Sequence, residues 1–319
     1  MKNQLRHRCP VCGHNELKRH FSAKDLDNLF DSPFTLQRCR LCNLIFLGDI
    51  VKTNGLYNKA YYRKPNAALK PFFDLGLYLF ILDRIRFVKK YVQSPGKILD
   101  VGCGDGAFLL RMKERGWRAC GVDSSPSAAE YLEANNLTIL GKDFLHCDIE
   151  PKSFDVITYW YSFEHLSDPA EHLKRAYGAL CNDGTLIISV QNIESLQAVF
   201  SRDRWFHLDL PWHVLHFSPQ SLKRALTEAN FKVLDINHNS LQMNIFGWHQ
   251  SLLNRLGCKP NFLYKLFKRG NAGSKKEFFS LLMTLLASPF IFPLSVIFSK
   301  AEELCRRGGV ITAIAKKRF

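Results

Sequence analysis

Four cysteines near the start of the chain have the spacing of a metal site. They form two Cys-x-x-Cys pairs, Cys9 with Cys12 and Cys39 with Cys42, and 26 residues separate the pairs. Each pair makes a tight turn that directs two thiolates at one point, and two such turns supply the four sulfurs of a tetrahedral zinc ion. Because thiolate fills all four positions, we predict a structural zinc that takes no part in catalysis. Two coincidental pairs, or a redox Cys-x-x-Cys, are the alternatives.

A glycine-rich turn in the centre of the chain is typical of a nucleotide-type cofactor site. Residues 97–109 read KILDVGCGDGAFL, an apolar strand that ends in Gly102, Gly104 and Gly106 before a helical pattern begins. Glycines let the backbone approach a ligand closely, and a helix N-terminus favours electron-rich groups. A second predicted strand, residues 118–122, ends in Asp123, where an acidic side chain can accept hydrogen bonds from both hydroxyls of a ribose.

Elements that would position these residues alternate along the chain. Further apolar runs predict strands around residues 138–140, 154–159 and 185–190, and helices begin at Asp168-Pro169 and Ser218-Pro219. Alternating strands and helices of this kind make a parallel sheet that is wound on both faces. The sequence therefore predicts an α/β fold.

The ordered motifs resemble a known enzyme family. DVGCGDG, GVDSS, GKD, FDVI, FEHLSDP and NDGTLIISVQN are similar to class I methyltransferases that use S-adenosylmethionine, over about residues 95–240. A nicotinamide-binding Rossmann domain is the nearest competitor, but the third glycine of its fingerprint would fall at Phe108-Leu109. The resemblance implies a doubly wound, mostly parallel seven-stranded sheet.

The same resemblance assigns the cofactor contacts. Asp123 would hold the ribose of S-adenosylmethionine, and a loop after the third strand would meet the adenine. For Asp143 the alternative is a loop residue that caps a turn. The residues implied are Asp100, Gly102, Gly104 and Gly106 for the methionine portion, Asp123 for the ribose, and Asp143 and Phe144 for the adenine.

Three histidines are candidates for the catalytic base. Methyl transfer is an in-line displacement, so the enzyme holds a nucleophile against the methyl group and removes its proton. His165 in FEHLSDP follows the fourth strand, and in related enzymes this motif is a wall of the pocket. His213 and His216 lie in LPWHVLHFSP after the fifth strand, with Trp205 and Trp212 beside them. We choose His213 as the base, and the alternative is that these histidines bond backbone in a buried turn.

Charge and missing motifs narrow the acceptor. The formal net charge is +15, with 13 Lys/Arg against 5 acids in residues 1–70 and 13 against 3 in residues 255–319. Basic ends attract nucleic acid or an anionic membrane. The Asn/Asp-Pro-Pro-aromatic stretch of nucleobase amino-methyltransferases is missing after the fourth strand, which favours oxygen or carbon acceptors. The cysteine module and YNKAYY (57–62) resemble methyltransferases of bacterial sugar and surface-glycan pathways.

These observations lead to one expected function with two alternatives. We expect a methyltransferase that acts on a small or lipid-linked acceptor, such as a sugar of an envelope glycolipid. An RNA methyltransferase that grips phosphate with its zinc module and basic ends is one alternative. A binding protein that keeps the cofactor fold without turnover is the other. The N-terminus has no apolar segment of a signal peptide, and six scattered cysteines read as buried apolar residues, so we expect a cytoplasmic protein.

An apolar stretch near the C-terminus bears on the membrane. Residues 278–299 carry no charge and contain Pro289 and Pro293. If residues 232–238 and 309–315 pair as the last two strands of the sheet, one crossing by this stretch would separate them. Pro289 would also limit the first helical piece to about 11 residues, roughly 16 Å. We therefore expect a broken helix or hairpin in peripheral contact with the inner face of an anionic membrane, or a self-packed substrate lid.

The predicted organisation has four parts. Residues 1–60 form a zinc module and residues 61–94 a helical linker. Residues 95–240 and 307–319 form the S-adenosylmethionine-binding domain, and residues 241–306 are a basic and apolar insertion.

Overall fold

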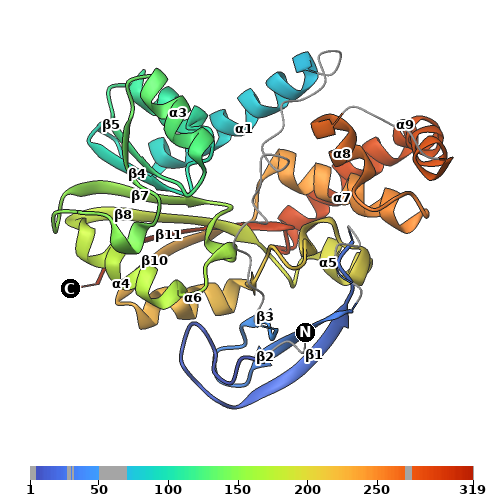
Figure 1. Cartoon of the computed structure of the whole chain (residues 1–319), viewed down its shortest axis with the longest axis horizontal. Coiled ribbons are helices and arrows are strands. Elements are labelled where there is room, and N and C mark those ends of the chain that lie inside the picture. Colours follow the sequence, from blue (N-terminus) through green and yellow to red (C-terminus); the bar gives the residue numbers. More distant parts are fainter. Residues whose placement is uncertain (1–4, 27–29, 31, 50–69, 270–274, 319) are drawn as a thin grey trace.

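Seven strands form one mixed sheet in the centre of the molecule (Figure 1). The computed structural model describes residues 5–26, 30, 32–49, 70–269 and 275–318. The last strand pairs antiparallel with both of its neighbours, and the other pairings within the sheet are parallel. In spatial order the strands are β10 (Phe231–Asn237), β11 (Val310–Lys317), β8 (Leu180–Gln191), β7 (Phe154–Trp160), β4 (Lys97–Val101), β5 (Arg118–Val122) and β6 (Thr138–Gly141). This confirms the predicted doubly wound, mostly parallel sheet.

Helices cover both faces of this sheet (Figure 1). On one face lie α1 (Lys70–Tyr91), α2 (Ala107–Lys113) and α3 (Pro126–Ala134), and on the other lie α4 (Pro169–Ala179) and α6 (Pro219–Glu228). The central strands are buried from both sides, as the nearly continuous apolar runs of β4 and β7 require. The carboxyl ends of the parallel strands consequently meet at one edge, where ligands of open α/β sheets bind.

The N-terminal module forms its own four-stranded sheet. Its strands are β1 (Leu17–Ala23), β2 (Phe34–Cys39) and β3 (Ile45–Leu47), and the fourth is β9 (Leu215–His216), which comes from the stretch after β8. Ile45 pairs with His216 and Phe46 pairs with Leu215. Buried side chains of the module, including Phe46, belong to the same apolar cluster as the central sheet. The module is therefore joined to the domain by strand pairing and by a shared core.

Short elements connect β7, β8 and β9. They are η2 (Phe163–His165), α5 (Leu196–Ser201), η3 (Arg202–Arg204) and η4 (Phe206–Leu208), and a further short element, η1 (Phe144–His146), lies between β6 and β7. Two of the candidate histidines lie here, His165 in η2 and His216 in β9, and His213 lies in the turn just before β9.

Three helices form an arm between β10 and β11. They are α7 (Leu241–Arg255), α8 (Phe262–Arg269) and α9 (Lys275–Leu304), and they lie together at the end of the molecule away from the C-terminus (Figure 1). The antiparallel pairing of β10 with β11 confirms the insertion between neighbouring strands.

The expectation that Pro289 would break the apolar helix is wrong. Helix α9 continues for 30 residues through both Pro289 and Pro293. Each proline removes a backbone hydrogen bond and crowds the preceding turn. Both prolines lie on the exposed side of α9, whereas α7 packs along its other side, so that packing keeps the two parts of the helix continuous.

Part of the predicted organisation is outside the described residues. The YNKAYY segment (57–62) and residues 61–69 of the predicted linker belong to that part. Within the described part, α1 accounts for most of the linker, and its buried Ile81, Ile85 and Val88 pack into the core beneath β4 and α2.

Replacing Phe46 tests the shared core of the module and the domain. We expect Phe46→Ala to lower the free energy of unfolding by about 3–5 kcal/mol, because the phenyl ring is fully buried and its removal leaves a cavity. Chemical denaturation followed by circular dichroism measures this. Leu41→Ala, at an exposed position of the same module, is the control and should change the value by less than about 0.5 kcal/mol. Equal effects of the two variants would contradict a shared core.

Candidate functional site

The turn after β4 leaves an open space for a ligand. Gly102, Gly104 and Gly106 all have positive φ angles, +78°, +57° and +72°, which favour glycine. A Cβ on Gly102 would lie 2.5 Å from Cβ of Ser162, so glycine is required there for packing. A Cβ on Gly104 would meet nothing within 4 Å, because this part of the turn faces the cavity.

Asp123 is held at the end of β5 by backbone donors. Its Oδ2 accepts a hydrogen bond from Gly104 N at 2.8 Å, and its Oδ1 accepts one from Ser125 N at 2.8 Å. These bonds link the two loops that border the cofactor cleft and fix the direction of the carboxylate. Each carboxylate oxygen has a further lone pair, so the pair of oxygens can still accept from two ligand hydroxyls. The ribose contact at Asp123 stays a prediction, which this geometry permits.

Asp100 lies deeper than the other predicted cofactor residues. Its Oδ1 accepts a hydrogen bond from Thr158 Oγ1 at 2.7 Å, whereas its buried Oδ2 has no hydrogen-bond partner among the described residues. Burial raises the pKa of Asp100 to about 6, and the nearby Arg84 guanidinium opposes that rise. An unsatisfied acceptor beneath the glycine turn fits a ligand ammonium, the group that the methionine portion carries.

The adenine contacts of Asp143 and Phe144 stay a prediction. Asp143 borders the cavity but also caps a turn, and Phe144 is buried. Asp143 accepts a hydrogen bond from Leu145 N at 3.0 Å and pairs with His146 at 2.8 Å, so it does cap the turn at η1. It also borders the cavity, as Lys142 does. Phe144 is almost completely buried against Tyr159 and His172. Only a small part of the Phe144 ring is available to contact the adenine ring.

A cavity of about 590 Å³ joins the cofactor loops to the N-terminal module. On one side lie Gly102, Gly104 and Asp123, and on the other lie His165 and Trp212. The sequence did not indicate two further lining residues, Arg6 and Asp49, because they come from the N-terminal module. Asp49 also accepts a hydrogen bond from Thr35 N, which fixes its side chain. The N-terminal module therefore contributes the polar side chains of Arg6 and Asp49 to the lining of the cavity.

The three candidate histidines occupy different positions. His165 lines the cavity, and its Nδ1 bonds to the carbonyl of Trp212 at 2.8 Å. His213 packs behind it, with ring centroids 4.8 Å apart, and its Nδ1 bonds to the carbonyl of His207 at 2.8 Å. His216 is buried in β9 and pairs with the zinc module. The structure thus brings His165 and His213 together and directs His165 toward the cofactor loops.

Burial keeps these imidazoles neutral. It lowers the pKa of His165 below its usual value and lowers the pKa of His213 to about 4. Because a carbonyl can only accept a hydrogen bond, Nδ1 of each ring carries a proton. Neutral imidazoles of this kind can accept a proton at neutral pH.

Glu164 is a site residue that the sequence analysis did not select. It is buried next to His165 and His213, and within the described structure neither carboxylate oxygen has a partner in hydrogen-bond geometry. Burial raises the pKa of Glu164, while the neighbouring His213 and the Gln191 side chain favour its charged form. The feature of the sequence that could have indicated Glu164 is its position directly before His165 in FEHLSDP.

Taken together, the residues present fit S-adenosylmethionine. The glycine turn leaves open space, Asp123 presents a fixed carboxylate, and Asp100 has an unsatisfied acceptor below the turn. In this arrangement Asp100 and the glycines would hold the methionine portion and Asp123 the ribose. His165 and Trp212 face them across the cavity.

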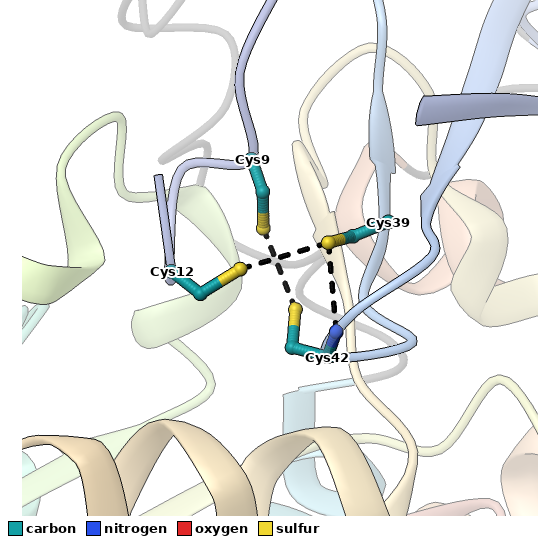
Figure 2. Close-up of side chains that lie close together, drawn as sticks. All are labelled: Cys9, Cys12, Cys39 and Cys42. Carbon is teal, nitrogen blue, oxygen red and sulfur yellow. Dashed lines mark hydrogen bonds between the residues drawn. The ribbon is translucent and has the colours of Figure 1, made fainter. Parts of the chain in front are cut away.

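The four N-terminal cysteines converge on one point (Figure 2). Sγ of Cys9 lies 3.5 Å from Sγ of Cys42, and Sγ of Cys12 lies 3.6 Å from Sγ of Cys39. Four sulfurs at about 2.3 Å from a tetrahedral zinc would be separated by nearly these distances. Burial and the neighbouring thiols raise the pKa of Cys12 to about 11, because a thiolate is unfavourable in a buried place next to other thiols. The cluster suggests a zinc site, and a bound Zn²⁺ would stabilise all four thiolates.

Comparison with known proteins agrees with this geometry. The model of the "Methyltransferase domain" family matches residues 76–236. A ubiquinone biosynthesis O-methyltransferase of Idiomarina loihiensis is 29% identical over 204 residues, which cover 59% of this chain and 81% of that protein. The enzyme of the same name from Glaesserella parasuis is 33% identical over 107 residues, or 30% of this chain and 45% of that one. The chain spans only about half the length of several such relatives.

A solved structure shows the same fold over most of the chain. It is phosphoethanolamine N-methyltransferase 2 of Haemonchus contortus, in complex with phosphomonomethylethanolamine and S-adenosylhomocysteine. The two chains are 15% identical, the TM-score is 0.52, and the match covers 95% of this chain and 68% of that one.

Removing the Asp123 carboxylate should weaken cofactor binding. We expect Asp123→Ala to raise the Kd for S-adenosylmethionine about 10- to 100-fold, because a hydrogen bond to a charged group contributes about 1.5–3 kcal/mol. Isothermal titration calorimetry measures this. Asp123→Asn separates loss of the charge from loss of the loop contacts, and Asp183→Ala, at an exposed position in β8, is the control. Unchanged affinity in both Asp123 variants would refute the assignment.

The zinc prediction concerns metal content and stability. Elemental analysis of the purified protein should find about one zinc per chain, and Cys39→Ser should lose it because a tetrahedral site needs all four ligands. The free energy of unfolding should fall with the metal. Cys305→Ser, at an exposed cysteine outside the cluster, should keep both. A protein that folds normally and holds no zinc would overturn this prediction.

Proposed function

Because this chain belongs to the methyltransferase domain family and is a methyltransferase that depends on S-adenosylmethionine, we propose that it methylates an oxygen or carbon atom of a small or lipid-linked acceptor. The envelope glycans or glycolipids of a bacterium are the acceptor class that we favour, and we place the reaction in the cytoplasm. The observation that carries the proposal is the single cavity in which His165 and Trp212 face Gly102 and Asp123. The named activity of the ubiquinone O-methyltransferases supports an oxygen acceptor.

The lining of the cavity supports an acceptor with hydroxyl groups. Arg6 and Asp49 provide a cation and an anion, and Trp212 provides an aromatic wall. Sugar rings present hydroxyls to charged side chains and C–H faces to aromatic rings, so this combination suits a sugar. An acceptor with a purely apolar head would leave the charged groups without partners.

The protein residues have distinct roles in the proposed reaction. Bound S-adenosylmethionine supplies an electrophilic methyl group on a sulfonium sulfur. The acceptor atom approaches in line, the new bond to the methyl carbon forms as the carbon–sulfur bond breaks, and Nε2 of His165 takes the acceptor's proton. His213 and Glu164 lie next to His165, and the Asp209 carboxylate is the charge that favours the imidazolium that results. Thus His165 takes the contact that the sequence analysis gave to His213, and His213 becomes a positioning residue.

Label transfer identifies the acceptor class. The purified protein is incubated with methyl-labelled S-adenosylmethionine and a fractionated bacterial extract, and each fraction is counted. We expect label in the lipid, polysaccharide or small-metabolite fraction. Label in RNA alone would refute the proposal and favour the RNA methyltransferase, and binding of the cofactor without any transfer would favour a non-catalytic protein.

The base assignment predicts a separation of binding and turnover. We expect His165→Ala to lower kcat by about 10²- to 10⁴-fold, because general-base catalysis contributes this much, while the Kd for S-adenosylmethionine stays unchanged. His213→Ala should have a smaller effect on kcat. His20→Ala, at an exposed position in β1, is the control. Full activity of His165→Ala would exclude the proposed base.

The pH dependence follows from the lowered pKa of His165. Burial favours the neutral ring, so the base form persists at pH values where an exposed histidine would be protonated. The rate should stay level as the pH falls from about 8 through about 6.5 and should decline only in more acidic solution. A profile of kcat against pH measures this, and a decline centred above 6.5 would contradict it.

A further inference from the structure

The helix α9 turns its large apolar side chains away from the protein. Phe278 and Phe290 are 67% and 74% exposed. Soluble proteins seldom expose a continuous apolar surface of this length, and such surfaces mark sites of interaction. The exposed large apolar residues of α9 are Phe278, Phe279, Leu282, Leu285, Leu286, Phe290, Phe292, Leu294, Ile297 and Leu304.

The buried side of α9 carries small hydroxyl residues instead. Ser280, Thr284, Ser295 and Ser299 are all buried, and their spacing follows one face of the helix. Ser295 and Thr284 donate hydrogen bonds to carbonyls four residues earlier, at 2.8 and 2.7 Å. The buried side of α9 thus combines these hydroxyl groups with an apolar contact at Ile291, whereas its large phenylalanine and leucine side chains point out, unlike those of a helix at a water-exposed surface.

Polar contacts join α9 to α7 and to the loop after α7, beside an apolar cluster that includes Leu253 of α7 and Ile291 of α9. His249 Nε2 of α7 lies 3.0 Å from Ser288 Oγ, and Lys259 N donates to Ser280 Oγ at 2.8 Å. The buried Gln250 and Asn254 of α7 contact other elements than α9: Gln250 Oε1 accepts from Tyr264 N at 3.0 Å, and Asn254 Nδ2 donates to the Arg204 carbonyl at 3.1 Å. Small residues and polar contacts between helices, with apolar groups outside, are typical of helices in contact with lipid.

A neighbouring helix extends the apolar surface. Val199 and Phe200 of α5 are exposed. The Phe200 ring contacts Trp248 of α7 at a centroid distance of 5.8 Å, and Trp248 contacts Phe298 of α9 at 5.0 Å. Because these rings connect α5 with α9 through α7, the two exposed regions border one another. We call this surface, α9 together with Val199 and Phe200, the apolar face.

The charge around the apolar face is positive. Residues 255–307 hold ten Lys/Arg and three acids. Glu277 pairs with Lys259 at 2.6 Å and Glu303 pairs with Lys300 at 2.7 Å, while the third acid, Glu302, is buried. Arg255 lies over the Phe200 ring at 5.4 Å. Cations around an apolar surface attract anionic lipid headgroups.

The arm is fixed to the domain at the C-terminal end of α9. The Glu302 carboxylate accepts hydrogen bonds from Gln197 N at 2.7 Å and from Gln197 Nε2 at 3.0 Å. Trp205 Nε1 donates to the same glutamine at 3.1 Å. The orientation of the apolar face is thus set by a buried polar network and does not depend on a flexible link.

Topology decides between crossing a membrane and lying on one. Among the described helices, Lys276–Leu304 is long and apolar enough to cross, and 17% of its most apolar window is buried. However, α7 leaves the sheet directly after β10, and α9 leads back to β11, which pairs with β10. Helix α7 also packs along α9, so a crossing would carry its buried polar side into the bilayer. A helix that lies in the plane of the interface avoids this cost.

We propose that the apolar face docks the protein onto an anionic lipid bilayer, with α9 in the plane of the interface. A lipid surface is favoured over a second copy of this chain, because two-fold pairing of the face would bring the same cationic residues together. The docking itself does not depend on catalysis. We infer that docking brings a lipid-linked acceptor to the cavity, and this role rests on the proposed function.

The position of α7 supports that use. Ser240, just before α7, lies 3.4 Å from the Tyr161 hydroxyl, and Tyr161 lines the cofactor cavity. The base of the arm therefore adjoins the site of methyl transfer. A lipid tail held in the bilayer would leave its polar head on the protein side.

Liposome flotation tests the docking. The full-length protein is mixed with vesicles of phosphatidylcholine, with or without phosphatidylglycerol, and the fraction that floats is measured. We expect most of the protein to float with the anionic vesicles and little with the neutral ones. The variant Phe278→Gln/Phe290→Gln should reduce the floating fraction at least about fivefold. Both phenyl rings are exposed in the free protein, and their burial in lipid would contribute to the free energy of membrane binding.

A matched variant controls for loss of apolar surface in general. Leu41→Gln/Leu234→Gln changes two exposed leucines outside the arm and should float like the unmodified protein. Equal flotation of all variants would refute the proposal. So would a protein that stays unbound and forms a dimer, by light scattering, that the Phe278/Phe290 variant breaks. Calorimetry with S-adenosylmethionine on the same samples shows whether the methyltransferase site is intact independently.

Labelling separates a helix in the plane from a crossing helix. Cys305 follows α9 and is exposed, and Lys276→Cys places a thiol near its other end. On vesicle-bound protein, a membrane-impermeant maleimide added outside should label both positions, as read by mass spectrometry. Protection of one of them until detergent opens the vesicles would show a crossing and overturn the proposal.

Discussion

The antiparallel placement of β11 between β8 and β10 is the constraint on which the other features depend. Seven backbone pairings with β8 and six with β10 hold this strand in the centre of that half of the sheet. Because β10 and β11 are neighbours, all 72 residues between them must leave the sheet and return to it. The arm therefore begins and ends at the same sheet, on one side of the molecule. This is compatible with a helix α9 that lies in the plane of the membrane interface, although α9 is long enough to span a bilayer.

A second pairing shapes the cavity. The two residues of β9 join the sheet of the N-terminal module, so the module is fixed beside the carboxyl ends of the parallel strands. Arg6 and Asp49 thereby become walls of the cofactor cavity. The cysteine cluster joins the turn before β1 to the turn after β2, within the module that carries that wall. A zinc ion bound there would stabilise the module without contacting the cavity.

Site electrostatics follow from burial. Burial raises the pKa values of Asp100, Asp123 and Glu164, and at Asp123 the backbone donors of Ser125 and Gly104 oppose the rise. The same burial keeps His165 and His213 neutral. Asp100 and Asp123 at the cofactor loops can hold a cationic donor, and the neutral His165 in the cavity lining can take a proton from an acceptor, while Glu164 and His213 lie next to His165.

Local patterns in the sequence determined the α/β class, the cysteine cluster, the glycine turn and the position of Asp123, because each depends on residues close together in the chain or on one strand end. They did not determine that His165 lines the cavity while His213 lies behind it, since that depends on how the 205–216 stretch folds over the strand ends. Nor did they indicate Arg6, Asp49 or Glu164. The continuity of α9 through Pro289 was decided by its packing on α7, and the outward direction of its apolar residues by the polar groups buried between these helices. Only the tertiary structure shows which face of an element meets the protein, because that choice is made by contacts between residues far apart in the chain.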